Sequence, residues 1–178
     1  LRQLCALRAY LLGRQEAGVL DATDRWIRTV ALNRLTGHSS GFFSVYTLPP
    51  NQAVSPQSQR RINARRRQRP PERDVKAIIL KKSRALLKDC DAASRDALAR
   101  AARQARFYVR SCLSLPQVED GSVALAVTSP PFLDVVNYAG DNWLRCWFCG
   151  VEAGGVEIAL LRKVEAWRAF MGGVFAEL

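Results

Sequence analysis

The sequence predicts an α/β fold from three features: short apolar runs closed by turn residues, longer stretches with helical spacing, and a stiff loop after one apolar run. The run Val123–Val127 consists of small and branched apolar residues, follows the turn residues Glu119–Ser122 and stops just before two prolines. A short apolar run bounded in this way is typical of a buried strand. Ligands of open α/β sheets bind beyond the carboxyl ends of the strands, so we expect the functional edge after Val127.

Two further strands are predicted. Phe42–Leu48 is rich in aromatic and β-branched residues and is closed by two prolines, and Phe107–Pro116 has the composition of a strand followed by a turn. The first of these strands is either part of a surface that grips DNA or a small hairpin packed on neighbouring helices.

Helices are predicted where apolar residues recur at intervals of three and four. The first covers residues 1 to about 13, and the second follows the N-cap candidates Asp21–Asp24 and continues to residue 35. Further helical stretches are expected at 74–87, 91–105, around 143–148 and at 158–178. The last carries a wide apolar stripe, which Gly172 and Gly173 interrupt.

The chain is strongly basic. It has 27 lysines and arginines against 16 aspartates and glutamates among 178 residues, which gives a net charge of +11. This charge predicts an anionic partner, either nucleic acid or an acidic membrane surface. No apolar run approaches the roughly 20 residues that span a bilayer, so we expect no membrane segment.

The positive charge is densest between residues 60 and 73. Seven arginines lie there: Arg60, Arg61, Arg65, Arg66, Arg67, Arg69 and Arg73. Guanidinium groups pair with phosphates and guanine edges, and the nearby amides of Gln59, Asn63 and Gln68 suit adenine edges. We therefore predict a DNA-binding segment, with a solvated arm that has no specific partner as the alternative.

The loop Thr128-Ser129-Pro130-Pro131-Phe132 combines a hydroxyl, backbone carbonyls and an aromatic ring. Each proline fixes φ near −65° and lacks an N–H, and a residue before proline is restricted to extended conformations, so the loop is stiff. The exocyclic amine of a nucleobase is a weak nucleophile, because its lone pair is conjugated with the ring. A site that methylates it must accept hydrogen bonds from the amine and hold the base flat, and this loop carries groups for both tasks.

This motif resembles that of the DNA amino-methyltransferases, in which Ser, Asn or Asp precedes Pro-Pro and an aromatic residue. In that family the serine form usually accompanies methylation of cytosine N4, and the aspartate form that of adenine N6. The resemblance is specific for residues 107–178. It implies a partial Rossmann-like methyltransferase domain, with 91–178 as part of the catalytic domain and 1–90 as a basic, mostly helical insertion or target-recognition region.

The resemblance implies roles for individual residues. Ser129 Oγ and the Pro130 carbonyl would accept the amine hydrogens of a base flipped out of the duplex, and Phe132 would stack on that base. Pro131 would keep the loop stiff. The residues expected to line the base pocket are Thr128, Asp134, Asn137 and Tyr138.

S-adenosylmethionine is the methyl donor that the resemblance implies, DNA is the substrate, and a restriction endonuclease is a candidate partner. The glycine-rich strand–loop–helix that binds the donor in this family does not occur in the sequence. In addition, Arg110–Cys112 replaces a Gly-Asp-Ala-like turn of the family. We therefore expect the chain to be part of a longer protein, with the glycine-rich loop upstream of Leu1.

Five cysteines are present, and Cys146 and Cys149 form a single CxxC pair. A structural zinc site usually needs four ligands, and the lone His38 is distant in sequence, so we expect no metal site. Without a secretory signal, reduced thiols and a cytoplasmic location are expected.

Two other functions stay open. One is methyl transfer to another planar amine, such as adenine N6, an RNA base or a protein glutamine. The other is a non-catalytic basic protein that binds nucleic acid, with an affinity that falls steeply with salt.

Overall fold

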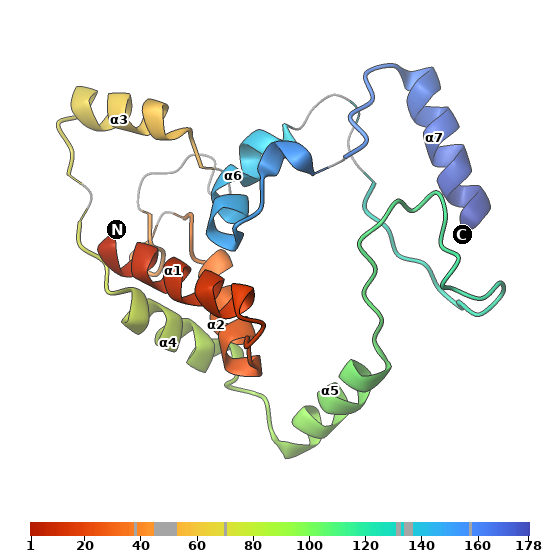
Figure 1. Cartoon of the computed structure of the whole chain (residues 1–178), viewed down its shortest axis with the longest axis horizontal. Helices are drawn as coiled ribbons and strands as arrows, with labels where there is room; N and C mark the ends of the chain where they lie inside the picture. The colour runs from red at the N-terminus through yellow and green to blue at the C-terminus, as the bar shows by residue number, and fades with distance from the viewer. Residues whose placement is uncertain (38, 45–52, 70, 131–132, 134–136, 157) are drawn as a thin grey trace. The chain divides into compact units, whose positions relative to one another are not determined.

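The computed structural model describes residues 1–37, 39–44, 53–69, 71–130, 133, 137–156 and 158–178 (Figure 1). The regular elements of these ranges are α1 (Arg2–Glu16), α2 (Ala22–Leu32), α3 (Pro56–Arg65), α4 (Val75–Leu86), α5 (Ala92–Gln104), α6 (Tyr138–Cys149), the 3₁₀-helix η1 (Ala153–Gly155) and α7 (Val164–Glu177). The helices predicted at 1–13, 74–87 and 91–105 are confirmed. The last helix begins at Val164 rather than at residue 158.

The prediction of an α/β, Rossmann-like fold is wrong, because the described ranges contain helices and no β-strand. The predicted strand Val123–Val127 is irregular, and its apolar side chains face solvent: Leu125 is 78% exposed and Val127 is 88% exposed. The segment after Phe107 is likewise irregular, and Phe107 itself is 90% exposed.

The predicted strands do not form because, in the described part of the chain, they have no neighbouring strand to pair with. A strand is stable only when a neighbouring strand accepts and donates its backbone hydrogen bonds, and an isolated apolar segment lacks these partners. The predicted strand Phe42–Leu48 is only partly described. Residues 45–48 lie outside the described ranges, and Phe42–Ser44 is irregular.

The chain divides into two compact units. The first unit contains Leu1–Ala92 and Asn137–Val156, and the second contains Ala93–Val136 and Glu157–Leu178. Helix α6, which follows the predicted catalytic loop in sequence, therefore packs with the N-terminal helices and contacts α1. The sequence-based division at residue 90 did not anticipate this return of the chain.

The first unit has a core to which α1, α2, α4 and α6 contribute. Its buried members are Leu11, Val30, Ala31, Leu35, Val75, Ile79 and Phe148. Full burial of a leucine or phenylalanine side chain stabilises a fold by about 1.5–3 kcal/mol. Arg8 joins α1 to α6, because its Nε donates to the Trp147 carbonyl at 2.6 Å and its guanidinium carbon lies 4.7 Å from the Trp147 ring centroid.

Helix α2 begins with a buried carboxylate, Asp24, which is 2% exposed. Asp24 N–H donates to Asp21 Oδ1 at 2.8 Å and Asp21 N–H donates to Asp24 Oδ2 at 3.1 Å, so the predicted N-cap is confirmed as a capping box. From α1, Arg14 Nε donates to Asp24 Oδ2 at 2.6 Å and Tyr10 Oη donates to Oδ1 at 3.2 Å. These bonds attach α1 to the start of α2.

The second unit contains α5, α7 and the irregular segment 105–130. Met171 and Val174 on α7 are buried. Leu115 N–H donates to the Glu177 carboxylate, and a Cβ on Gly173 would lie 3.0 Å from Leu113 Cδ2. The turn around Leu113–Leu115 therefore lies against α7.

Candidate nucleic-acid interface and base-binding segment

The arginine-rich segment starts as a helix, α3, which its charge pattern did not predict. Ser55 is the N-cap, because its Oγ accepts a hydrogen bond from Ser58 N–H at 3.2 Å. Pro56 occupies the first helical position, where a missing N–H leaves no bond unmade. The Ser-Pro pair is the sequence signal by which this helix could have been found.

Helix α3 ends in a Schellman motif whose left-handed residue is an arginine. Gln68 N–H donates to the Asn63 carbonyl at 3.0 Å, and Arg67 N–H donates to the Ala64 carbonyl at 3.1 Å. Arg67 has a φ of 48°, in a region where glycine is preferred and a side chain raises the energy by about 1–2 kcal/mol. Arg65, Arg66 and Arg67 thus gather at the C-terminal end of α3, where positive charge complements the helix dipole.

The amides interleaved with the arginines bind one another. Gln59 Nε2 and Gln68 Nε2 each donate to Asn63 Oδ1 at 2.8 Å. These bonds hold the chain beyond the turn against α3. Reading of adenine by an asparagine uses both the oxygen and the nitrogen of its amide, so Asn63 would have to exchange these internal bonds for a base contact.

Six of the seven predicted DNA-binding arginines are exposed. They are Arg60, Arg61, Arg65, Arg66, Arg67 and Arg69. Within the part of the chain that the structure describes, no carboxylate forms an ion pair with them. A guanidinium without an internal anionic partner stays hydrated and available, which is the state that a phosphate contact requires.

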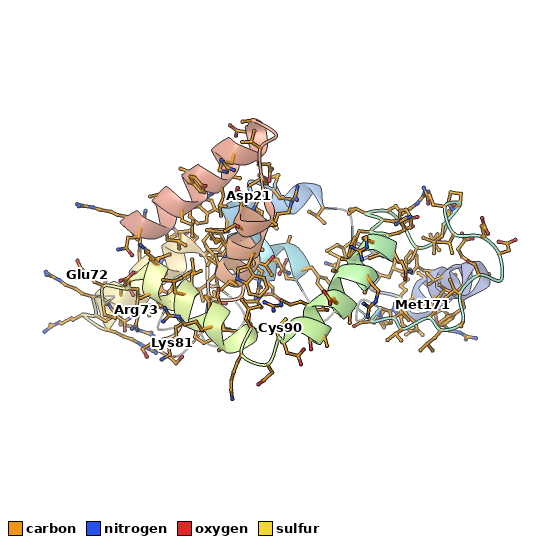
Figure 2. The ribbon with its side chains drawn as sticks, turned by 90° about the horizontal axis from the view of Figure 1, so that it is seen from below. Asp21, Glu72, Arg73, Lys81, Cys90 and Met171 are labelled. Carbon is orange, nitrogen blue, oxygen red and sulfur yellow. The ribbon has the colours of Figure 1, made fainter. Side chains whose placement is uncertain are left out.

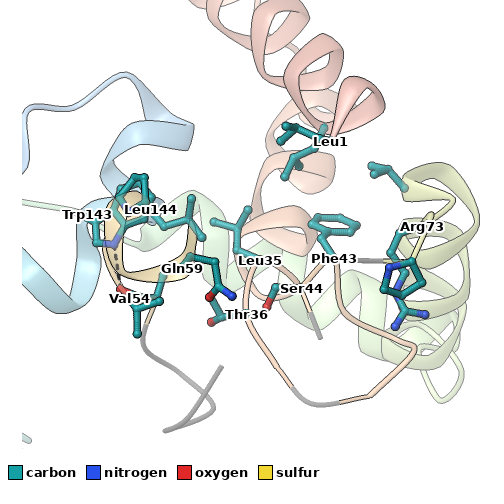
Figure 3. Close-up of a pocket in the computed structure, with 15 residues that line it drawn as sticks. Leu1, Leu35, Thr36, Phe43, Ser44, Val54, Gln59, Arg73, Trp143 and Leu144 are labelled. Atoms are coloured by element: carbon teal, nitrogen blue, oxygen red, sulfur yellow. Dashed lines mark hydrogen bonds between the residues drawn. The ribbon is translucent and has the colours of Figure 1, made fainter. Parts of the chain in front are cut away.

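Arg73 differs from the other six, because it is half-buried and lines a cavity of the first unit (Figure 3). The cavity has a volume of about 360 Å³ and mostly apolar walls, to which Phe43 and Trp143 contribute. The Nε of Arg73 and the Oγ of Ser44 are buried and have no hydrogen-bond partner among the described residues. Arg73 is therefore less available to an external phosphate than the six exposed arginines.

The predicted catalytic loop is partly described. Thr128 and Ser129 are exposed in an irregular segment of the second unit, and Pro130 is half-buried. The Ser129 side chain is thus accessible to solvent. Pro131, Phe132 and Asp134 lie outside the described ranges, so their roles stay predictions.

Asn137 and Tyr138, predicted to line the base pocket, form the start of α6. Asn137 is the N-cap, since its Oδ1 accepts a hydrogen bond from Gly140 N–H at 2.9 Å. This structural role was missed, although an asparagine before a helical stretch is a common N-cap signal. Both residues belong to the first unit and Ser129 to the second, so the structure describes the two halves of the predicted pocket separately.

The residues described here do not fit a binding site for S-adenosylmethionine. Gly18, Gly121 and Gly150 have a left-handed φ, but each is an isolated glycine at a turn or helix end. A glycine-rich loop instead needs several glycines in one strand–loop–helix, so that the backbone can approach the ligand closely. No described residue is therefore assigned to the methyl donor.

Over the described ranges, no group of three or more histidine, cysteine, aspartate and glutamate side chains is arranged to hold a metal ion. Cys146 and Cys149 are half-buried thiols on α6, and burial raises the pKa of the Cys149 thiol. His38 lies outside the described ranges. None of the described helices combines the length and the apolar character needed to cross a bilayer.

No protein-family model matches the chain, and no curated protein or solved structure shows significant similarity to it. The resemblance to DNA amino-methyltransferases therefore rests on the motif residues themselves.

Proposed function

We propose that the chain binds DNA through the exposed arginines of α3 and its C-terminal turn and holds a flipped cytosine by its amine at Ser129, as part of an enzyme that methylates cytosine N4. The observation that carries this proposal is the exposed hydroxyl of Ser129, which is followed directly by the half-buried Pro130 and its carbonyl. S-adenosylmethionine is the methyl donor that the motif implies.

The chemistry of the segment supports this proposal without a sheet. Ser129 precedes a proline, which restricts its backbone to extended conformations. Pro130 has a backbone carbonyl but no backbone N–H. It therefore adds a hydrogen-bond acceptor to the loop and no donor. Two acceptors match the two hydrogens of an exocyclic amine.

The arginines support the DNA partner. Extrusion of a base costs a few kcal/mol, and phosphate contacts on either side of the base offset part of it. Six exposed guanidinium groups around α3 supply such contacts. We also propose a cytoplasmic location, which suits a DNA substrate and reduced thiols, and a restriction endonuclease as a candidate partner.

A duplex with an unpaired cytosine tests the role of Ser129. The chain should bind a duplex whose target cytosine faces an abasic site more tightly than the fully paired duplex, because the base is already free to leave the stack. Ser129→Ala should reduce this preference by about tenfold, since it removes one acceptor for the amine. The readout is fluorescence anisotropy at fixed salt.

Ser114→Ala is the matched control, because Ser114 is also exposed and irregular in the second unit. This variant should keep the preference for the unpaired cytosine. Equal affinities of wild type and Ser129→Ala for both duplexes would remove Ser129 from the base site.

A second candidate function is a basic nucleic-acid-binding protein without catalysis. The exposed arginines favour it directly, since they need only an anionic strand. It predicts a steep salt dependence that Ser129→Ala leaves unchanged and no preference for an unpaired cytosine. A preference for unpaired adenine would instead indicate an adenine-N6 enzyme.

A further inference from the structure

A second cationic site lies on α4, outside the arginine-rich segment. It is a cavity of about 260 Å³ in the first unit, lined by three cationic residues, Arg34, Lys81 and Lys82, and by Ser40. Its described walls contain no aspartate or glutamate. Three positive charges without a carboxylate among the described lining residues create a positive potential that attracts anions.

Arg34 lines this cavity and is fixed by contacts within its own segment. Its guanidinium carbon lies 4.1 Å from the Phe42 ring centroid, and its carbonyl accepts a hydrogen bond from Phe43 N–H at 2.8 Å. Phe42 in turn covers Gly37, where a Cβ would approach the ring to 2.3 Å. The Nε of Arg34 is buried and has no hydrogen-bond partner among the described residues.

Helix α4 supplies most of the other residues that line the cavity. Ala77, Lys81 and Ala85 follow one another at intervals of four and share one face of the helix, and Lys82 adjoins them. The two alanines leave space beside the lysine stems. Lys81 lies at the surface of α4 (Figure 2) and Lys82 is half-buried, so the ammonium groups can reach a ligand that remains connected to solvent.

We propose that this pocket binds a phosphate group of a nucleic-acid strand. A lysine ammonium is a compact charge that suits phosphate oxygens, and the Arg34 guanidinium and the Ser40 hydroxyl add positive charge and a polar group to the same cavity. The opening to solvent admits a group that belongs to a longer chain. This inference rests on the nucleic-acid partner of the proposed function, not on its base chemistry.

The test compares two double variants with equal loss of charge. Lys81→Gln/Lys82→Gln removes both ammonium groups of the pocket, and Lys76→Gln/Lys88→Gln removes two lysines of α4 and its end that do not line it. DNA affinity is measured by anisotropy over a series of salt concentrations. The pocket variant should lower the slope of log affinity against log salt by about 1, the value for one lost phosphate contact, and the control should change it less.

Equal slopes for the two double variants would overturn the inference. A calorimetric titration with pyrophosphate separates a free phosphate from a strand: if the pocket variant loses pyrophosphate binding but binds DNA as the control does, the ligand is not nucleic acid. Should the pocket variant fail to fold by circular dichroism, Ser40→Asp, which adds a carboxylate at the rim, should weaken DNA binding more than Ser114→Asp does.

The lysine variants and the Ser129→Ala variant test the phosphate pocket and the proposed function separately. Loss of the unpaired-cytosine preference in Ser129→Ala concerns the base site. A change of salt slope in the lysine variants concerns the phosphate pocket, and either result stands without the other.

Discussion

Asp24 shows how a single residue joins two helices. Burial raises the pKa of its carboxyl group, but hydrogen bonds from Arg14, from Asp21 N–H and from Tyr10 outweigh this effect, so the pKa lies below its ordinary value. The ionised form is therefore favoured in the folded state. Removal of one partner would leave a buried charge or donor unsatisfied.

Acid unfolding tests this residue. The stabilisation by Asp24 is complete above the ordinary carboxyl pKa of about 4 and is lost as the pH falls through the lower pKa of the folded state. In Asp24→Asn, the free energy of unfolding should therefore be smaller at pH 7 and should fall less between pH 4 and pH 2. Urea unfolding at several pH values measures it. Asp120→Asn, at an exposed site, should keep the wild-type acid dependence.

The sequence indicates which candidate site residues are charged or polar, but not which residues they contact in the fold. Exposed arginines and an accessible Ser129 follow from the sequence, because charge and a Ser-Pro-Pro turn oppose burial. The half-burial of Arg73 and the capping role of Asn137 depend on residues distant in sequence or on helix boundaries. Arg34 was missed as well, since its stacking on Phe42 is a tertiary contact.

At the scale of elements, helices were predictable where one apolar face recurs, as in α2 and α4. Helix α3 was missed because it lacks a buried face and depends on its caps instead. The strands were wrong for the opposite reason. Apolar composition in Val123–Val127 signals burial in general, whereas a strand also requires a paired neighbour.

The end of α3 gives a prediction at this scale. Arg67→Gly should raise the free energy of unfolding by about 1 kcal/mol, because glycine adopts the left-handed φ without a Cβ clash. It should also weaken DNA binding by removing one exposed charge. Chemical denaturation and anisotropy measure the two effects.

Arg66→Gly is the matched control for the end of α3. Arg66 has a φ of −87°, in the right-handed helical region, where glycine loses more conformational entropy than other residues. Glycine at this position should therefore lower the stability while removing the same charge. Equal stability changes for the two variants would contradict the assigned turn.

At the scale of the whole molecule, the net charge of +11 is concentrated on identifiable surfaces of the first unit. One is the arginine group around α3, and the other is the pocket of Arg34, Lys81 and Lys82. The second unit carries Ser129. The charge proposed to bind DNA and the loop proposed to bind a base thus belong to different units of one chain.

Mass spectrometry of nucleosides from cells that express the full-length gene tests the proposed methyl transfer to cytosine N4. Their DNA should contain N4-methylcytosine, which should disappear when Ser129 is replaced by alanine and persist in the Ser114→Ala strain. DNA without N4-methylcytosine, or with an equal amount of it in the Ser129→Ala strain, would contradict the account.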